Sequence, residues 1–245
     1  MALTSLNPEL YDVFETIFPT SGGTRKLIRD INFRVLKTCM DITRGVCKGS
    51  VITTERIVEY PQLFRWIRPQ GLVLDIGCST SRLPIELASL GYTVYGLDIR
   101  PYPHRHENFL FVQSDLYEWN SPVLFDIITA VSSIEHFGLG YYGDKAISDG
   151  DYRAIEKLKS LIKPHGQLIL SVPFGARSVT ESHRVYDLNQ LQKLFADFTW
   201  IDSRFFRHHN HCWVPCDAED LKNVPSDTIP VSGVVLLNLA YPKQD

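Results

Sequence analysis

An apolar run, a turn of small residues and a second apolar run that ends in an acid constrain the fold of this chain more than any other feature. Residues 73–81 read Val-Leu-Asp-Ile-Gly-Cys-Ser-Thr-Ser, and Asp98 closes the following apolar run. The pattern predicts a strand, a tight turn, a helix N-terminus and a second strand, which together form the repeating unit of parallel α/β sheets. Such sheets bind ligands at the carboxyl ends of their strands, where Asp75 and Asp98 are expected to lie.

The turn favours one class of nucleoside ligand. Asp98 lies 21 residues after Gly77, an interval typical of a carboxylate that binds the two ribose hydroxyls. Cys78, Ser79 and Ser81 occupy a turn that would read Gly-x-Gly-x-x-Gly in a pyrophosphate binder. Because a pyrophosphate needs close backbone approach at several glycines, this turn favours S-adenosylmethionine over NAD.

These residues resemble the first motif of the class I S-adenosylmethionine-dependent methyltransferases, an acid-x-Gly-x-Gly-x-Gly turn. Asp75, Gly77, Ser79 and Ser81 stand at its four positions, so serine replaces two of the three glycines. The resemblance implies a Rossmann-like α/β fold with a seven-stranded, mostly parallel sheet and helices on both faces. It covers roughly residues 70–205 and is expected to extend to the end of the chain.

Hydrophobic periodicity predicts the elements of such a fold. The predicted strands are 72–75, 93–98, 110–113, 125–131, 167–172, 198–206 and 231–241. The predicted helices are 82–90, 152–162 and 188–195. Residues 163–166, Lys-Pro-His-Gly, are interpreted as the stop signal of the second helix. The last strand is expected to enter the sheet antiparallel, at its edge.

Residues 1–50 are predicted to form a helical extension that precedes a methyltransferase domain at 51–245. A short helix is expected over 8–17. From 24 to 48, apolar residues recur every three or four positions, which indicates one face of an amphipathic helix. The opposite face carries seven basic residues against two acids. It is either a solvated face or a basic lid over an anionic acceptor.

The resemblance assigns cofactor roles to residues at the strand ends. Asp75 would support the turn and the methionine ammonium, Asp98 the ribose, and Asp115 the adenine amino group. Val131 and Ser132 would lie beside the sulfonium. A solvated acid at a strand end is the alternative for Asp98. The complete predicted cofactor-binding set is Asp75, Gly77, Cys78, Ser79, Ser81, Asp98, Ile99, Asp115, Leu116, Val131 and Ser132.

Two segments at the same sheet edge carry candidate catalytic residues. Glu135 and His136 follow the fourth predicted strand, and His183 follows the fifth. A carboxylate beside an imidazole is typical of a general base or a metal site. Oxygen and imidazole ligands suit a divalent ion such as Mg, Mn or Zn, so the three residues form both the predicted catalytic set and the predicted metal site. Local hydrogen bonding is the alternative for each histidine.

The Glu-His pair and the later histidine resemble the metal site of the small-RNA 2′-O-methyltransferases. Ubiquinone-biosynthesis O-methyltransferases have a related arrangement. The RNA enzymes use Glu-x-x-Glu-His, and Ser132 stands here at the first glutamate, so one ligand is missing or is supplied by water or another residue. Residues 133–144 are also similar to bacterial proteins of unassigned activity, some found with surface-glycan or secondary-metabolite methyltransferases. That similarity implies a sugar or natural-product acceptor.

These observations predict an S-adenosylmethionine-dependent methyltransferase that acts on a hydroxyl of a small polar acceptor, such as a sugar, a glycan precursor or a natural product. A hydroxyl hardly ionises near neutral pH, so it needs a base such as His136 or His183, or a metal that lowers its pKa. The alternatives are RNA 2′-O-methylation and a non-catalytic module that binds a nucleoside or a partner. An NAD-dependent enzyme is disfavoured by the serine-substituted turn.

Composition narrows the expected partners and compartment. The net charge of −3 and the lack of an appended RNA-binding domain argue against a nucleic-acid partner. No apolar run reaches the roughly 20 residues of a membrane helix, and no signal-peptide pattern opens the sequence. Five cysteines without framework spacing are interpreted as reduced thiols in a cytoplasmic protein. Oligomeric state is left open.

A last cluster, residues 205–213, contains three histidines and a cysteine within five positions. It is interpreted as a zinc-binding segment, a loop that lines the acceptor pocket, or an ordinary surface loop. Adjacent side chains of an extended chain point to opposite faces, which disfavours a shared ion at His208 and His209.

Overall fold

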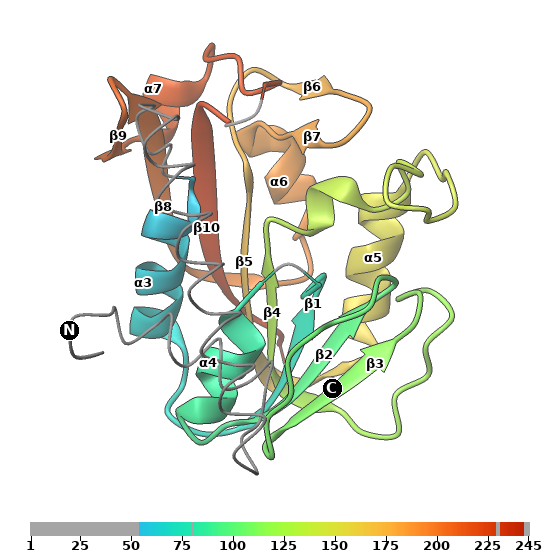
Figure 1. Ribbon diagram of the computed structural model, residues 1–245. Coiled ribbons are helices and arrows are strands. Elements are labelled where there is room, and N and C mark those ends of the chain that lie inside the picture. The colour runs from blue at the N-terminus through green and yellow to red at the C-terminus, as the bar shows by residue number, and fades with distance from the viewer. Residues whose placement is uncertain (1–53, 80, 229–230, 243–245) are drawn as a thin grey trace, which may run out of the picture. The chain divides into compact units, whose positions relative to one another are not determined.

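One eight-stranded sheet organises the part of the chain that the computed structural model describes, residues 54–79, 81–228 and 231–242. Its strand order is β3-β2-β1-β4-β5-β10-β8-β9, and β6 and β7 form a separate two-stranded ribbon (Figure 1). The strands are β1 (Leu72–Ile76), β2 (Thr93–Asp98), β3 (Phe109–Gln113), β4 (Phe125–Val131), β5 (Ile162–Pro173), β6 (Ser178–Val179), β7 (Arg184–Val185), β8 (Thr199–His209), β9 (Cys212–Cys216) and β10 (Gly233–Ala240). The helices are α3 (Arg56–Trp66), α4 (Leu83–Ser89), α5 (Gly150–Lys159), α6 (Leu188–Leu194) and α7 (Ala218–Leu221), with a 3-10 turn, η2 (Ile134–His136).

The sheet has a parallel half and an antiparallel half. β3, β2, β1, β4 and β5 pair in parallel. β10 is antiparallel to both β5 and β8, and β9 is antiparallel to β8. The predicted fold class, a Rossmann-like sheet covered by helices, is confirmed.

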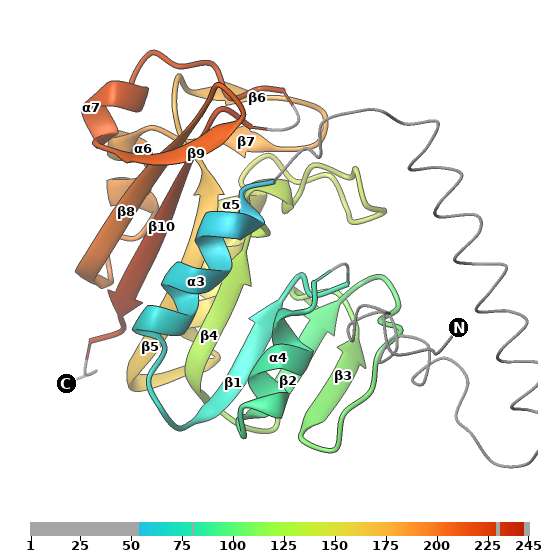
Figure 2. The same cartoon turned by 60° about the vertical axis from the view of Figure 1, so that its left-hand side comes forward.

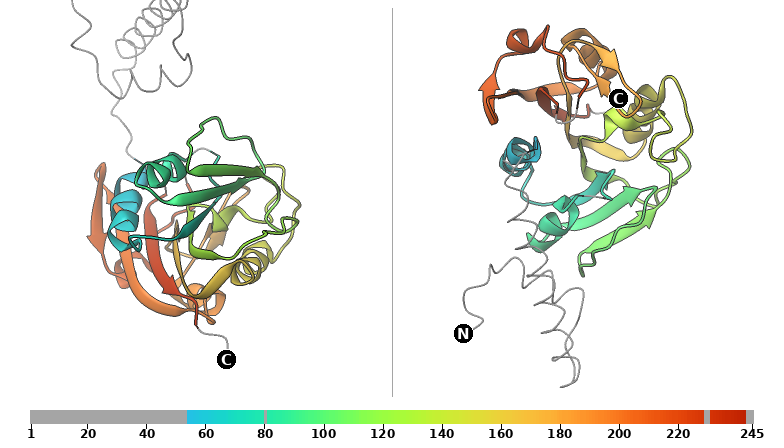
Figure 3. Two further views of the ribbon diagram at one scale, coloured as in Figure 1. Left: turned by 90° about the horizontal axis from the view of Figure 1, so that it is seen from below. Right: turned by 45° about the horizontal axis from the view of Figure 1, so that its top comes forward.

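Side chains of the sheet alternate between two apolar layers. In β1, Leu74 and Ile76 belong to the cluster that contains residues of α5 and α6, whereas Val73 belongs to the cluster with residues of α3 and α4. In Figure 2, α3 and α4 stand in front of the strands. Seen from below, α4 and α5 lie on opposite sides of the sheet (Figure 3, left). Because apolar layers cover both faces, a polar ligand site is expected at the strand ends.

The final strand corrects the predicted topology. The sequence predicted entry at the edge of a seven-stranded sheet, but β10 lies between β5 and β8 and pairs along both (Figure 1). Seven of its eight residues are buried, as expected for a strand with a neighbour on each side. The eighth strand is β9, which the sequence pattern did not predict.

The predicted helix stop at 163–166 is also corrected. α5 ends at Lys159, and β5 begins at Ile162, so the Lys-Pro-His-Gly segment belongs to a strand. The His165 N–H donates to the Tyr241 carbonyl at 2.9 Å, which ties the segment to the chain just after β10. Long-range pairing therefore outweighs the local turn preference, which remains only as the positive φ of 60° at His165.

The histidine-rich segment is a β-hairpin of β8 and β9. Asn210 and His211 form its two-residue turn, with φ of 48° and 62°, as a type I′ turn requires. The His208 ring faces Trp213 across the ladder, with ring centroids 5.1 Å apart. Across the described residues, no group of three or more His, Cys, Asp or Glu side chains could hold a metal ion. The zinc interpretation therefore finds no support in this hairpin.

The predictions for the N-terminal extension, namely the helices at 8–17 and 24–48 and the boundary at 50, lie outside the described residues. None of the helices that are described is both long enough and apolar enough to cross a membrane.

The interior position of β10 leads to a stability prediction. Leu237 is fully buried and pairs with Leu170 of β5 and Ser203 of β8. Leu237→Ala should lower the free energy of unfolding by about 2–5 kcal/mol, because it leaves a cavity in the core. Ile201→Ala is the control, since Ile201 on β8 is 60% exposed, and should change it by less than about 0.5 kcal/mol. Urea unfolding measures both, and equal effects would contradict the central placement of β10.

Candidate active site

The strand order reverses between β1 and β4, and polar residues gather at this point. The chain runs from β1 through α4 to β2 on one side, whereas β4 and β5 lie on the other. In open α/β sheets, ligands bind outside the carboxyl ends of the strands at such a reversal. Asp75 and Asp98 lie at the ends of β1 and β2, and Ser132 directly follows β4. The structure thus brings three of the predicted site residues to one edge.

Asp75 is only 2% exposed, and it uses one carboxylate oxygen. Oδ1 accepts a 2.6 Å hydrogen bond from the Thr129 hydroxyl on β4, and Oδ2 has no partner among the described residues. Burial raises the pKa of Asp75 to about 7, against the opposing effects of the Thr129 bond and the Arg56 charge. A buried oxygen without a donor is costly, so this position fits an N–H or ammonium group of a ligand.

The turn after β1 has no room for a side chain at its first position. Gly77 has a φ of 73°, and a Cβ placed there would overlap the Ser133 hydroxyl in the segment after β4. The Gly77 N–H donates to the Leu97 carbonyl at 2.8 Å, which fixes the turn to β2. Glycine is therefore needed both for the left-handed backbone and for the close approach of the two turns.

Cys78 lies beneath the turn rather than on its ligand side. Its side chain is fully buried, and a Cβ added at Gly96 would come within 2.9 Å of its sulfur. Burial, with the nearby charge of Asp75, raises the pKa of the Cys78 thiol. Of this predicted cofactor residue, only the backbone remains to contact a ligand.

The two serines of the turn are held by neighbouring elements. The Ser79 N–H donates to Oδ2 of Asp98 at 2.8 Å. The Ser81 hydroxyl hydrogen-bonds the Tyr60 phenol of α3 at 2.8 Å, and the Ser81 carbonyl accepts from the Tyr102 hydroxyl at 2.8 Å. Both serines that replace glycines of the methyltransferase motif thus lie in a turn that contacts from the surrounding protein already fix.

Asp98 accepts four hydrogen bonds from the protein itself. Besides Ser79, the donors are the backbone N–H and the guanidinium of Arg100. The same guanidinium lies over the Tyr142 ring, 4.3 Å from its centroid, and so joins the segment after β2 to the segment after β4. Asp98 is at the predicted ribose position, but its carboxylate is occupied by a neighbouring side chain.

The remaining predicted cofactor residues after β2 and β3 have different roles. Asp115 accepts a 2.9 Å hydrogen bond from the Tyr117 N–H and so caps the turn after β3. Leu116 is 2% exposed and belongs to the core, so it supports this turn from below. Ile99 is partly exposed, and its carbonyl accepts from the Gln113 side chain at 3.1 Å.

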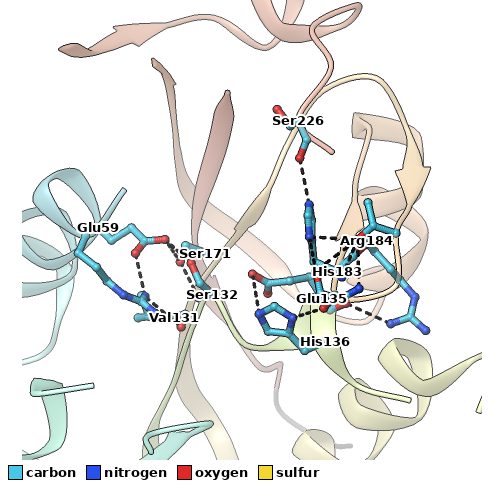
Figure 4. Close-up of polar contacts among 12 residues, drawn as sticks. Glu59, Val131, Ser132, Glu135, His136, Ser171, His183, Arg184 and Ser226 are labelled. Atoms are coloured by element: carbon cyan, nitrogen blue, oxygen red, sulfur yellow. Dashed lines mark hydrogen bonds and ion pairs between the residues drawn. The ribbon is translucent and has the colours of Figure 1, made fainter. Parts of the chain in front are cut away.

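A buried carboxylate of α3 holds the ends of β4 and β5. Glu59 is fully buried, and its Oε1 accepts from the hydroxyls of Ser132 at 2.7 Å and Ser171 at 2.6 Å (Figure 4). Its Oε2 accepts from Arg56 at 2.9 Å, and Arg56 also donates to the Val131 carbonyl at 3.2 Å. These contacts hold Ser132 at a φ of 45°, a left-handed conformation that non-glycine residues rarely adopt.

Glu135 is the second buried carboxylate with an unpartnered oxygen. It is 2% exposed, and its Oε2 makes no hydrogen bond to the described residues. Burial raises its pKa well above the ordinary value, and the nearby charge of Glu59 adds to the effect. Glu135 therefore favours its protonated form and can donate as well as accept a hydrogen bond at this edge.

His136 presents one ring nitrogen with a free electron pair. Its Nδ1 is hydrogen-bonded to the Ser182 carbonyl, which can only accept, so Nδ1 carries the proton and Nε2 does not. Nε2 lies 3.8 Å from Oε1 of Glu135 (Figure 4). Burial lowers the pKa of His136, which keeps the ring neutral near pH 7. A neutral imidazole with a defined tautomer is suited to accept a proton.

His183, the third residue of the predicted catalytic and metal-binding set, makes hydrogen bonds at both ring nitrogens. Its Nε2 donates to the Ser226 carbonyl at 3.1 Å, and its Nδ1 accepts from the Ser182 hydroxyl at 3.1 Å. The Thr180 hydroxyl lies 3.2 Å from Nδ1 and donates to the His183 carbonyl at 3.0 Å. The ring is 3% exposed and points to Ser226 (Figure 4). Both nitrogens are therefore hydrogen-bonded within the protein, whereas Glu135 and His136 face each other. The catalytic and metal-binding roles of Glu135, His136 and His183 stay predictions.

Arg184, the residue after His183, anchors the catalytic candidates. Its guanidinium donates to the carbonyls of Glu135 at 3.3 Å and Phe137 at 2.7 Å, on either side of His136. Asp151 of α5 lies 3.7 Å from the Arg184 Nε and provides the compensating charge. The segment around His183 therefore contributes to the site through Arg184, which holds the backbone on both sides of His136.

Sequence reasoning missed the residues that hold the site, namely Arg56, Glu59, Arg100 and Arg184. Arg100 and Arg184 lie within two positions of predicted site residues, which was an available signal. Arg56 and Glu59 precede the first strand and belong to no motif. Only the packing of α3 against the sheet brings them to the end of β4.

Several solved structures share this fold. The N-methyltransferase NodS from Bradyrhizobium japonicum WM9 matches with a TM-score of 0.50 and 15% identity over 77% of this chain and 99% of that chain. The 1,6-didemethyltoxoflavin-N1-methyltransferase from Burkholderia thailandensis matches with a TM-score of 0.51 and 16% identity over 91% and 92%. The [4+2]-cyclase SpnF matches with a TM-score of 0.56 and 13% identity over 80% and 86%. At these identities the likeness establishes the fold of the S-adenosylmethionine-dependent methyltransferases.

The chain belongs to the family described as "Caenorhabditis protein of unknown function, DUF268", whose sequence model matches residues 112–236. This range begins near the end of β3 and includes Glu135, His136 and Arg184. No curated protein matches the sequence.

The Glu59 contacts predict a large effect of a single substitution. Glu59→Ala should lower the free energy of unfolding by about 3–5 kcal/mol, because Arg56 and two serine hydroxyls lose a buried acceptor. Glu219→Ala is the matched control, since this helix glutamate is paired with Lys222 at the same spacing but is 81% exposed. Urea unfolding should show a change of less than about 0.5 kcal/mol for the control. A small effect of Glu59→Ala would show that the contacts of Glu59 with Arg56, Ser132 and Ser171 are dispensable for stability.

The raised pKa of Asp75 predicts a pH dependence. Its pKa is about 7 in the folded protein and near 3.8 when exposed, so the folded state binds more protons between these values. The stability from this group is therefore full below about pH 4 and is lost as the pH rises to about 7, by up to about 1.4 kcal/mol per pH unit. The free energy of unfolding, measured at pH 5, 6, 7 and 8, should fall for wild type relative to Asp75→Asn as the pH rises. Asp227→Asn, at an exposed residue, should run parallel to wild type; parallel curves for Asp75→Asn would contradict the prediction.

Proposed function

We propose that the chain is an S-adenosylmethionine-dependent methyltransferase that acts on a hydroxyl of a small polar acceptor, such as a sugar, a glycan precursor or a natural product. The observation that carries the proposal is the pair of acids at adjacent strand ends beside a glycine turn. Asp75 has a buried oxygen without a partner among the described residues, and Asp98 ends β2, at the position predicted for the ribose contact. Two neighbours support the cofactor, since NodS and the Burkholderia enzyme were solved with bound S-adenosylhomocysteine.

The residues present fit the cofactor's polar groups. The unpartnered Oδ2 of Asp75 suits the methionine ammonium, which would favour the ionised carboxylate. The close approach at Gly77 leaves backbone rather than side chain facing the ligand. Asp98 can accept from both hydroxyls of a ribose once its guanidinium partner leaves. Asp115, which follows β3, uses one carboxylate oxygen to cap Tyr117. Its second carboxylate oxygen could accept from the adenine amino group.

His136 is the proposed general base. S-Adenosylmethionine supplies an activated methyl group when bound, so the protein must align the acceptor and remove its proton. Nε2 of His136 has the required electron pair, and the Ser182 carbonyl fixes the ring in that tautomer. Oε1 of Glu135 lies 3.8 Å from this nitrogen, and the protonated form of Glu135, which its raised pKa favours, can donate a hydrogen bond that positions the acceptor oxygen. Arg184 acts as a positioning residue through the carbonyls on either side of the histidine.

A base at this position favours a hydroxyl acceptor, because an amine needs only a free electron pair and proximity. The neighbours named N-methyltransferases show that the same fold also serves nitrogen acceptors. Since both nitrogens of His183 are bonded to the protein, no residue set is assigned here to a divalent ion. The net charge of −3 supports a small molecule rather than a nucleic acid as the acceptor.

Cofactor binding is the first test of the proposal. Calorimetric titration should show micromolar binding of S-adenosylmethionine or S-adenosylhomocysteine to wild type, and Asp98→Ala should weaken it by about tenfold or more, since two charge-assisted bonds to ribose are lost. Asp126→Asn is the matched control, because Asp126 lies at the opposite end of β4, where it binds Leu72 and Lys163. It should leave the affinity unchanged.

His136→Ala separates binding from chemistry. It should retain the cofactor affinity and lose methyl transfer to a panel of hydroxyl compounds that wild type methylates. If neither S-adenosylmethionine nor S-adenosylhomocysteine binds to wild type or to any variant, including Arg100→Ala, the methyltransferase proposal fails.

A further inference from the structure

The carboxylate of Asp98 is shared between two kinds of donor. The backbone N–H groups of Ser79 and Arg100 donate at 2.8 Å each, one to each oxygen. The Arg100 side chain adds two longer bonds, from Nε to Oδ1 at 3.2 Å and from a terminal nitrogen to Oδ2 at 3.3 Å. Each carboxylate oxygen therefore has one short backbone donor and one longer side-chain donor.

The backbone donors orient the carboxylate of Asp98, whereas the Arg100 side chain occupies its remaining acceptor positions. The backbone donors belong to the turns after β1 and β2 and cannot leave without unfolding these turns. The side-chain donors belong to one guanidinium, whose residue is 32% exposed. A ribose diol presents two adjacent hydroxyls to the two oxygens of a carboxylate, in the same manner as the two nitrogens of a guanidinium. With four lone-pair positions already used, Asp98 has no place for the diol while Arg100 is bound.

We propose that Arg100 determines the affinity of the site for its nucleoside ligand, because its guanidinium occupies on Asp98 the two positions that the ribose hydroxyls need. The inference rests on the proposed function and deepens it. The nucleoside binds by displacing the guanidinium, while the bonds from Ser79 and from the Arg100 backbone stay in place. The guanidinium acts as an intramolecular competitor of the ribose.

Tyr142 gives the displaced side chain a place to remain. The Arg100 Cζ lies 4.3 Å from the centroid of the Tyr142 ring, and this ring packs edge-on against His136, with centroids 5.1 Å apart. A guanidinium that releases Asp98 can stay over the aromatic face, since that contact does not depend on the carboxylate. Tyr142 is 36% exposed, so the movement needs no rearrangement of the core.

The size of the effect follows from competition. The apparent dissociation constant equals the intrinsic constant divided by the fraction of molecules in which Asp98 is free. A partly exposed ion pair lowers the fraction of molecules in which Asp98 is free by about two- to tenfold. Removing the guanidinium should therefore lower the dissociation constant of a ribose-containing ligand by about the same factor.

The test is calorimetric titration of S-adenosylhomocysteine into the full chain and its variants. Arg100→Ala and Arg100→Gln should both bind about two- to tenfold more tightly than wild type. Arg153→Ala is the control, because Arg153 on α5 also pairs with an aspartate, the N-cap Asp149, at 2.9 Å, in a more exposed ion pair. This variant should bind S-adenosylhomocysteine with wild-type affinity. Circular dichroism establishes that each variant is folded.

A second pair of ligands tests the role of the diol. Adenosine should gain affinity from Arg100→Ala, whereas 2′,3′-dideoxyadenosine, which has no diol, should gain none. Equal or weaker binding of S-adenosylhomocysteine by both Arg100 variants would overturn the inference and leave the proposed function intact. Binding of S-adenosylhomocysteine only by the Arg100 variants would support both the inference and the proposed function. An equal gain for both nucleosides would show a general charge effect and would also overturn it.

Discussion

The geometry at the strand reversal depends on the buried carboxylate of Glu59. This residue joins α3 to the ends of β4 and β5 through two serine hydroxyls and one guanidinium. A buried ion pair adds little net stability relative to apolar packing, since desolvation offsets the attraction. Its contribution here is directional. By holding Ser132 in a left-handed conformation, it sets the direction in which the chain leaves β4, and so the place where Glu135 and His136 reach the sheet edge.

Two histidines illustrate how similar contacts lead to different chemistry. Each ring donates to one backbone carbonyl, His136 through Nδ1 and His183 through Nε2. For His183, the Ser182 hydroxyl then satisfies the second nitrogen, and the ring becomes part of the support of the β6–β7 ribbon. For His136, the second nitrogen faces the Glu135 carboxyl at a distance too long for a hydrogen bond, and its electron pair stays available. The difference lies in the second nitrogen.

Local signals explain what the sequence could predict. The strands before Asp75 and Asp98 and the turn at Gly77 are encoded by short patterns, so their residues were expected at one sheet edge and lie there. The position of β10, the pairing of 163–166 and the role of His183 depend on partners far along the chain. A Lys-Pro-His-Gly segment contains a turn signal, and only pairing with the chain after β10 makes it a strand. Likewise, no pattern distinguishes a structural histidine from a base before the neighbouring carbonyls are known.

One residue of the β8–β9 hairpin bears on how this protein behaves at high concentration. Strand β9 ends the sheet order, and in the described part of the chain it pairs only with β8. Outer strands of this kind are templates on which sheets of two molecules can join. Pro215 stands within β9, opposite Phe206, and has no N–H to offer an incoming strand. A fold that exposes a strand edge thus carries its own block to uncontrolled extension of the sheet.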